Sequence, residues 1–367
     1  MTFVRVRRGI RKLIRTTNRA SRKLARRVHL HSDPSVRELE EAGTSESPAF
    51  IKAKQKSFST PQAVIDTVIH RAVGSSTVGI ERIMKGVDNE VYAVETAGGD
   101  QLVVKISRNE ESGSRLGKER WAIEQCAKAE IPVSQIVSLD TIEFEDKPLG
   151  ILIQTKLPGI PLDEMLKDNR SENNTDELFR KAGSILSRVN SIETNGFGEL
   201  DRNGNGEYDS IGKMFSPAAF DKAYCIEVAH NVDLEEEIIE RALEELYDCQ
   251  TNYPKVPARL IHNDFAPRHL LIRDTQISGI VDFEDAQGGD PAREFARWEF
   301  FFEHRYPLDG LKEGYENSAI FRNDFERRLH LWKLHTGLGQ LVYCYRQEFK
   351  RGIELCKDRL TKDVARF

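Results

Sequence analysis

The spacing of apolar residues changes near residue 157, and this change constrains the fold more than any other feature. Before it, Thr60-Pro61 predicts a helix capped by Thr60 that ends before Gly74. Short alternating runs then predict strands at residues 78–84, 90–95, 101–107, 136–144 and 149–156, interrupted by one helix at 112–129. After Leu157-Pro158-Gly159 the spacing is mostly helical, except for short apolar runs between residues 259 and 282. We therefore expect an α+β protein with a small β-rich lobe over residues 59–156 and a larger, mainly helical lobe over residues 157–367.

The first 58 residues have a different composition from the rest. Residues 1–32 hold eleven Lys and Arg and no acid, with apolar residues close to helical spacing, which predicts a basic amphipathic arm. Such an arm suits an anionic membrane surface, an organellar transit segment or a weakly ordered tail. Residues 33–58 lack periodicity and are interpreted as a linker, so the folded body begins near Ser59.

Composition excludes several classes of protein. The 367 residues are 39% hydrophobic and 31% charged, which is typical of a globular chain, and no apolar run reaches the ~20 residues of a membrane span. Without the arm, 43 basic residues face 59 acidic ones, a net charge of −16, so no specific nucleic acid partner is expected. The five cysteines form no C-x-x-C pair, which favours a reducing, cytoplasmic location. If the basic arm binds a membrane surface, the protein would instead be membrane-peripheral.

The densest cluster of polar residues lies among the short runs of the second lobe. His262-Asn263-Asp264 follows one apolar run, His269 comes five residues after Asp264, and Asp282 follows a further run. Each residue alone has an ordinary structural explanation as a core histidine or a turn residue. Together they match phosphoryl transfer, which needs a carboxylate to accept the proton of the attacking hydroxyl and side chains to hold Mg²⁺. The spacing assigns the first role to Asp264 and the second to His269 and Asp282.

The small lobe supplies the complementary half of such a site. A turn containing Gly86 and Asn89 joins two predicted strands, where backbone amides can cover phosphates. Lys105 ends an apolar strand and is assigned to the phosphates, with Glu119 of the next helix as its expected partner. A lysine in a strand is by itself most often part of a solvated face.

The order of these motifs resembles the aminoglycoside phosphotransferase family of small-molecule kinases. The resemblance spans roughly residues 78–303 and rests on eight motifs in family order: Gly86–Asn89, Val103–Lys105, Glu119, Ile131–Val133, Leu157–Gly159, Gly196–Gly198, His262–Asp264 and Asp282–Ala292. It implies a bilobal protein-kinase-like fold.

In that fold the resemblance makes Lys105 and Glu119 the phosphate-side ion pair and assigns Gln154, Thr155 and Leu157 to the hinge against the nucleotide base. Asp264 would be the catalytic base, and Asp282 a metal ligand. Asp290 and Glu294 fall where the family stabilises the loop, so their expected roles are structural.

The catalytic loop departs from the usual family pattern. The family has H-G-D-L-H-x-x-N. This chain has Asn263 in place of the glycine, Ala266 in place of the second histidine and His269 in place of the final asparagine. Mg²⁺ prefers oxygen ligands, which argues against a histidine. However, the loop is similar to the 2''-aminoglycoside phosphotransferase branch, which has a histidine there and makes GTP a donor to test beside ATP.

The sequence thus predicts a Mg²⁺-dependent kinase acting on a hydroxyl group of a small molecule. The acceptor is either aminoglycoside-like or a choline, sugar or amino-alcohol metabolite; Glu299 and Glu303 are candidates for binding a cationic acceptor, or simply a solvated acidic surface. The alternative is a pseudokinase, a nucleotide-sensing module that the arm docks to an anionic surface.

Overall fold

The computed structural model describes residues 59–83, 89–108, 110–145, 147–167, 175–306 and 308–366. The predicted arm (1–32), the linker (33–58) and Gly86 lie outside these ranges. Within these ranges, none of the helices combines the length and the apolar composition that a membrane span requires.

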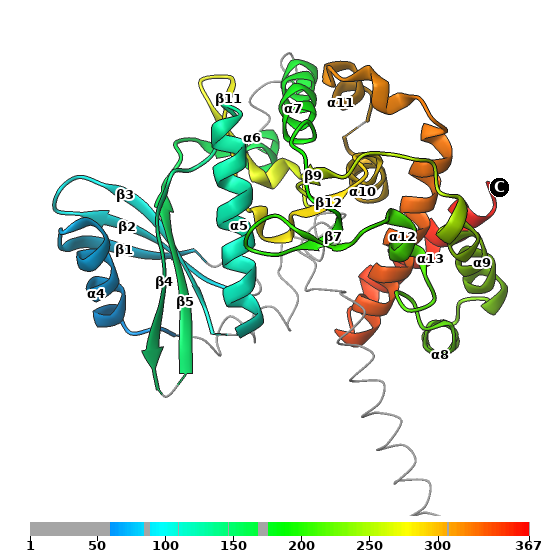
Figure 1. Ribbon diagram of the computed structural model, residues 1–367, viewed down its shortest axis with the longest axis horizontal. Helices are drawn as coiled ribbons and strands as arrows, with labels where there is room; N and C mark the ends of the chain where they lie inside the picture. The colour runs from blue at the N-terminus through cyan, green and yellow to red at the C-terminus, as the bar shows by residue number, and fades with distance from the viewer. Residues whose placement is uncertain are drawn as a thin grey trace, which may run out of the picture.

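The small lobe is built on one antiparallel sheet of order β1-β2-β3-β5-β4. Its strands are β1 (Thr77–Ile83), β2 (Glu90–Thr96), β3 (Gln101–Ser107), β4 (Ile136–Phe144) and β5 (Lys147–Thr155). Helix α4 (Gln62–Val73) lies on the outer side of the sheet, and helix α5 (Glu110–Lys128) runs between the sheet and the large lobe (Figure 1). Ile65 and Ile69 of α4 pack against Val104 and Ile153 in a core confined to this lobe, so the sheet has one face for each helix.

The start of α4 differs from the prediction. Thr60-Pro61 predicts that Thr60 caps the helix, but the helix begins after Pro61 without a side-chain cap. Instead, the backbone nitrogen and Oγ1 of buried Thr60 donate to the carboxylate of Glu90 at 2.8 and 3.0 Å. Thr60 therefore ties the chain to β2, because a long-range carboxylate competes successfully with the helix end. The predicted end of α4 is confirmed by Gly74, whose φ of 69° suits glycine.

The large lobe contains most of the helices. They are α6 (Leu162–Lys167), α7 (Thr175–Val189), α8 (Lys222–Asn231), α9 (Glu236–Asn252), α10 (Ala292–Phe302), α11 (Leu308–Gly314), α12 (Phe325–Arg346) and α13 (Lys350–Val364). Short 3₁₀ helices occur at η2 (Ile211–Phe215), η3 (Pro267–His269), η4 (Phe283–Asp285) and η5 (Ser318–Phe321). The sequence did not predict α8, whose apolar residues show little helical spacing.

Two small sheets of the large lobe position the polar loops. One has the order β11-β10-β6 and the other β8-β7-β12-β9. Their strands are β6 (Ile160–Pro161), β7 (Phe197–Leu200), β8 (Gly206–Tyr208), β9 (Arg259–Ile261), β10 (Leu270–Arg273), β11 (Gln276–Ile280) and β12 (Gln287–Gly289). Leu270 pairs with Ile280, and Ile261 pairs with Gln287. The segment between β9 and β10 therefore lies beside the segment between β11 and β12.

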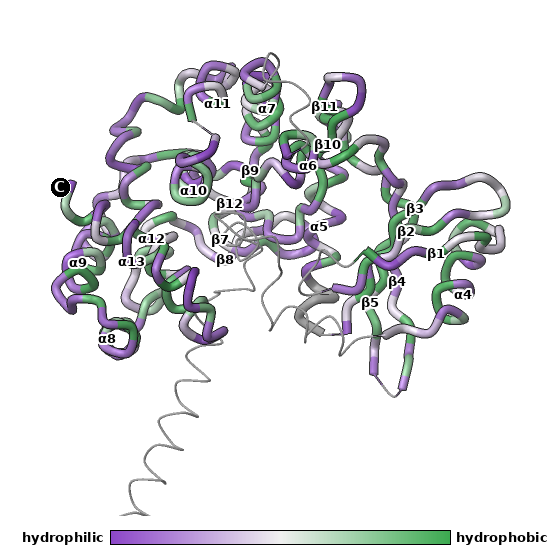
Figure 2. Tube along the Cα trace, turned by 180° about the vertical axis from the view of Figure 1, so that it is seen from behind, coloured by the Kyte–Doolittle hydropathy of each residue, from purple (hydrophilic) through white to green (hydrophobic). Residues whose placement is uncertain are grey.

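A large apolar core joins the two lobes. Ile123 and Cys126 of α5 belong to the same buried cluster as Leu186, Trp298 and Trp332 of the large lobe. Figure 2 shows the pattern, with hydrophobic segments in the strands and a hydrophilic turn between β10 and β11. All five cysteines are buried, and none forms a disulfide bond. Since α5 contributes to this core and also covers the sheet, it fixes the small lobe against the polar loops of the large one.

Candidate active site

Lys105 and Asp282 link the two lobes directly. Lys105 lies on β3, and its Nζ donates to Glu119 Oε1 of α5 at 2.5 Å and to Asp282 Oδ1 at 2.8 Å. Glu119 is fully buried and Lys105 is 7% exposed. The structure thus brings together three residues that the sequence assigned to phosphate and metal binding, from segments up to 177 positions apart.

The charges of this cluster stabilise one another. Burial alone would lower the pKa of Lys105, but Asp282 and Glu119 outweigh it and raise that pKa. Desolvation would raise the pKa of Asp282, but Lys105 and His269 hold it well below its usual range. For Glu119, burial prevails over Lys105 and raises the pKa. Lys105 is therefore a permanent cation and Asp282 a permanent anion at neutral pH.

Asp264 lies deep in the loop that follows β9, with 2% of its surface exposed. Arg268 Nη2 donates to both of its oxygens at 2.7 Å, and Arg297 Nη2 of α10 lies 3.8 Å from Oδ1. His269 Nδ1 lies 2.9 Å from the backbone oxygen of Asp264. Asn263 adopts a φ of 61°, an unusual conformation for a residue other than glycine that turns the chain between β9 and Asp264.

Glu294 of α10 anchors this loop. Its Oε1 accepts from the backbone nitrogens of His262 and Asn263, the latter at 3.1 Å, and His262 Nε2 lies 3.1 Å from the Val281 oxygen. Burial raises the pKa of Glu294 to about 7 and lowers that of His262 to about 4. These contacts match the structural role expected for Glu294. Asp290 likewise pairs with Arg328 of α12, at 2.7 and 2.8 Å.

The residues assigned to Mg²⁺ are adjacent. His269 Nε2 lies 3.4 Å from Asp282 Oδ2, and the Asp282 side chain is 35% exposed. Asp282, two residues after β11, adopts φ 71° and ψ 62°, and its carboxylate contacts Lys105 of the small lobe. Among the described residues no three His, Cys, Asp or Glu gather as a metal cluster. One carboxylate fits Mg²⁺ nonetheless, because this ion is commonly held by one or two carboxylates plus substrate phosphates.

The other nucleotide-site candidates lie at the edges of this cluster. Gln154 and Thr155 end β5, Gln154 is 5% exposed, and Leu157 lies two residues after the strand. Thr155 Oγ1 accepts from the backbone nitrogen of Gln135 at 2.9 Å. Asn89, immediately before β2, donates from its Nδ2 across the lobes to Glu284 Oε2 at 2.8 Å, so this side chain ties the start of β2 to the loop of Asp282.

Glu299 and Glu303 do not join the cluster. Glu299 lies 2.7 Å from Lys333 Nζ and 3.5 Å from Arg366 Nη1, and Glu303 Oε2 lies 3.5 Å from Arg359 Nη1. Both carboxylates therefore already have cationic partners within α12, α13 and the C-terminal turn.

Sequence reasoning missed three arginines and one glutamate around the site. Arg268 and Arg297 contact Asp264, and Arg115 of α5 donates to Glu284 at 3.2 Å. Arg268 lies four residues after Asp264 within the recognised loop, so its position was a usable signal. The contacts of Arg297, Arg115 and Glu284 have no such local signal, because their partners are far away in the chain.

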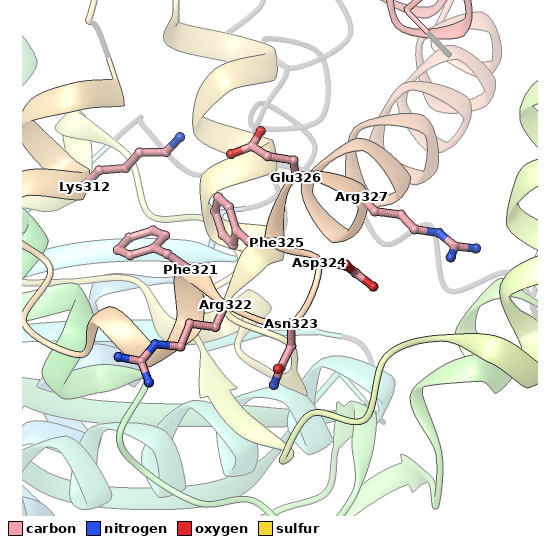
Figure 3. A pocket seen from close by; sticks show the side chains of 8 residues that line it. All are labelled: Lys312, Phe321, Arg322, Asn323, Asp324, Phe325, Glu326 and Arg327. Atoms are coloured by element: carbon pink, nitrogen blue, oxygen red, sulfur yellow. The ribbon is translucent and has the colours of Figure 1, made fainter.

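Two surface pockets lie apart from these residues. One, of about 470 Å³, is bordered by α7 and α11. The other, of about 520 Å³, lies at the start of α12, where Phe321 and Phe325 stack edge to face at 5.0 Å and Lys312 Nζ lies 5.4 Å from the Phe325 ring (Figure 3). Neither is lined by a candidate residue of the active site.

The bilobal fold, in which Lys105, Glu119 and Asp282 meet between the lobes, is that of protein-kinase-like phosphotransferases. Residues 79–328 match the model of the phosphotransferase enzyme family, and the chain belongs to that family. The family is one of phosphotransferases, and the curated relative described next is named as a 4-O-kinase, so the protein is a phosphotransferase with an alcohol group as acceptor.

Individual relatives are aminoglycoside kinases. The chain is 22% identical over 280 residues to hygromycin-B 4-O-kinase of Escherichia coli, covering 72% of this chain and 74% of that one. A thermostable mutant of aminoglycoside phosphotransferase APH(4)-Ia, in ternary complex with AMP-PNP and hygromycin B, has a TM-score of 0.64 at 19% identity, covering 82% and 97% of the two chains. The GDP and kanamycin complex of APH(2'')-IIIa has a TM-score of 0.54 at 16% identity, covering 83% and 99%. At these identities the solved structures support the fold.

Proposed function

We propose that the protein transfers the γ-phosphoryl group of ATP or GTP to a hydroxyl group of a small molecule. The observation that carries the proposal is the single cluster in which Lys105 and Asp282 bridge the lobes while Asp264 lies on the adjacent loop. Nucleotide complexes of both kinds, with AMP-PNP and with GDP, are known among proteins of similar fold, which supports testing both donors.

Asp264 orients the acceptor hydroxyl and takes its proton as the oxygen attacks the γ-phosphorus and the nucleoside diphosphate departs. A carboxylate offers about four lone-pair positions, so the contacts with Arg268 leave room for a hydroxyl. Lys105, held by Glu119, binds the donor phosphates. Asp282, with His269 beside it, would hold Mg²⁺, which when bound neutralises charge on the phosphates.

A nucleotide-sensing pseudokinase is the second candidate. The observation that favours it is Arg268, which contacts both oxygens of the proposed base. The arm that would dock such a sensor to an anionic surface, residues 1–32, lies outside the described residues.

A nucleotide-turnover assay with Mg²⁺ separates the two candidates. ATP and GTP are supplied separately with a pooled panel of aminoglycosides, choline-like alcohols and sugars. A positioned acid–base group is worth about 10²- to 10⁴-fold in rate, so Asp264→Asn is expected to lose acceptor-dependent turnover by that factor while nucleotide binding is retained.

The matched control for this assay is Asp274→Asn, which removes an 88% exposed carboxylate from the β10–β11 turn and should leave the rate unchanged. Equal rates for Asp264→Asn and the control would remove Asp264 from the mechanism. Nucleotide binding without turnover of any acceptor would favour the sensor.

A further inference from the structure

Arg268 contacts both oxygens of the proposed base. Its Nη2 donates to Oδ1 and to Oδ2 of Asp264, each at 2.7 Å. The side chain of Arg268 is 7% exposed and that of Asp264 is 1% exposed, so little water competes with the contact. Because one nitrogen reaches both oxygens, the contact restrains the rotation of the carboxylate and does more than balance its charge.

This contact is local to one short loop. Arg268 lies four residues after Asp264, in the 3₁₀ helix η3, and follows Pro267, whose ring restricts the backbone just before it. The backbone nitrogen of His269 donates to the oxygen of Ala266 at 2.9 Å, which closes the turn of η3. The side chain of Arg268 therefore folds back onto the start of the loop that carries it.

The backbone of the loop has anchors that do not involve Arg268. At one end, Oε1 of Glu294 accepts from the backbone nitrogens of the two residues before Asp264. At the other end, the backbone nitrogen of Val281 donates to the oxygen of His269 at 3.0 Å. Removing the guanidinium of Arg268 would therefore loosen the carboxylate of Asp264 while the main chain on either side stays attached.

A guanidinium beside a catalytic carboxylate has two opposite effects. It favours the ionised carboxylate over the protonated one, which opposes proton transfer to it. It also holds the carboxylate in one orientation. Catalysis of phosphoryl transfer is almost entirely positioning and electrostatic stabilisation. A misplacement of about 1 Å can cost about 100-fold in rate, so the gain in orientation outweighs the loss in basicity.

We propose that Arg268 is a positioning residue for phosphoryl transfer, which holds the carboxylate of Asp264 in the orientation that receives the acceptor hydroxyl. This inference rests on the proposed kinase function and adds a residue to its site. The acceptor proton passes to Asp264, and Arg268 acts only through that carboxylate. In a nucleotide sensor the same contact would block the base, so the two roles predict opposite effects of removing the guanidinium.

Steady-state kinetics of Arg268→Met test the proposal, with ATP or GTP and the panel acceptor that the wild type turns over fastest. kcat should fall by about 100-fold, the loss that follows from misplacing a reacting group by about 1 Å. KM for the nucleotide should stay within about threefold, because Lys105 and Asp282 remain in place. Arg268→Lys keeps the charge but not the planar fork, so its kcat should lie between those of Arg268→Met and the wild type.

The matched control is Arg273→Met on β10. The side chain of Arg273 is 62% exposed beside Asp274, so its loss should leave kcat and KM unchanged. The melting temperature of each variant shows that the protein used in the assay is folded. If Arg268→Met does not fold, Arg268→Gln replaces it, since its amide can still donate to one oxygen of Asp264.

A double-mutant cycle shows whether Arg268 acts through Asp264. Losses caused by residues that act as a unit do not add in free energy. In the Asp264→Asn background, the further change Arg268→Met should therefore lower kcat by less than about threefold, although it costs about 100-fold in the wild type. Losses that multiply would show that Arg268 acts by another route and would overturn the proposal.

The outcomes also separate this inference from the proposed function. Turnover that is lost in Asp264→Asn but unchanged in Arg268→Met would retain the kinase function and overturn the positioning role. A higher kcat in Arg268→Met would identify the arginine as a block on the base and would overturn the role as well. Absence of wild-type turnover with every donor and acceptor would count against the kinase function and overturn this inference with it.

Discussion

Replacing Arg328 with methionine is expected to destabilise the large lobe. Arg328 lies in the first turn of α12, where its Nη1 donates to both oxygens of Asp290 at 2.7 and 2.8 Å. Its other nitrogens donate to the backbone oxygens of Ile320, Arg322 and Asn323. Arg328 is 2% exposed and Asp290 is not exposed. The pair therefore joins the end of the Asp282 loop to α12 in a water-excluded site.

The expected magnitude follows from what remains after the change. Asp290 would keep its buried charge with the Tyr253 hydroxyl at 2.6 Å and the Ala292 N–H at 2.9 Å. Removing one partner of a buried ion pair costs about 3–5 kcal/mol in the free energy of unfolding. For a lobe of this size each kcal/mol lowers the melting temperature by about 2–4 °C, so a fall of about 6–20 °C is expected.

Thermal unfolding followed by circular dichroism measures the effect. Arg327→Met is the matched control, since Arg327 lies on the same turn of the same helix but is exposed, and it should lower the melting temperature by no more than about 2 °C. The double variant Arg328→Met with Asp290→Asn should be less destabilised than the sum of the single variants, because it leaves no unpaired charge. Equal melting temperatures for Arg328→Met and Arg327→Met would refute the reasoning.

Two further predictions concern the loop anchor and the phosphate-side cation. Burial raises the pKa of Glu294 to about 7, so between pH 4.5 and 7 the folded state binds a proton that the unfolded state has lost, and stability falls as pH rises through this window. In denaturant unfolding, the free energy of unfolding of Glu294→Gln minus that of the wild type should increase over that pH range by on the order of 3 kcal/mol. A difference that does not vary with pH would contradict the raised pKa. Lys105→Met leaves Glu119 and Asp282 facing each other without a cation, so kcat/KM for the nucleotide should fall by at least about 100-fold. A change of less than threefold in steady-state assays would show that Lys105 does not bind the phosphates.

The sequence identified the polar residues that end strands, and the structure shows why this was feasible. Asp264 and Asp282 each follow a short strand, where side chains are presented at a shared edge, whereas Lys105 was expected to end its strand and instead lies inside β3, which continues to Ser107. The change near residue 157 likewise marks the junction of the two lobes, since β5 ends at Thr155 and α6 begins at Leu162. These features depend on local spacing, which a single sequence records.

Other features escaped because their cause is not local. Helix α8 was missed because its apolar residues lack strong helical spacing, and its position depends on packing against α9 and α12. Thr60 was assigned to a helix cap, but its partner is Glu90, thirty positions away.

The sequence by itself determined the class of chemistry, because phosphoryl transfer requires a base, a cation and a metal-holding carboxylate, and their order along the chain is specific. Tertiary structure alone decided the charge around Asp264. Arg297 reaches Asp264 only because β12 pairs with β9 and sets α10 beside the loop. The same packing gives Glu299 and Glu303 cationic partners on α13 and α12. Charge acts over distances of a few ångströms in space, whatever the separation in sequence, so the electrostatics around Asp264 follow from the fold.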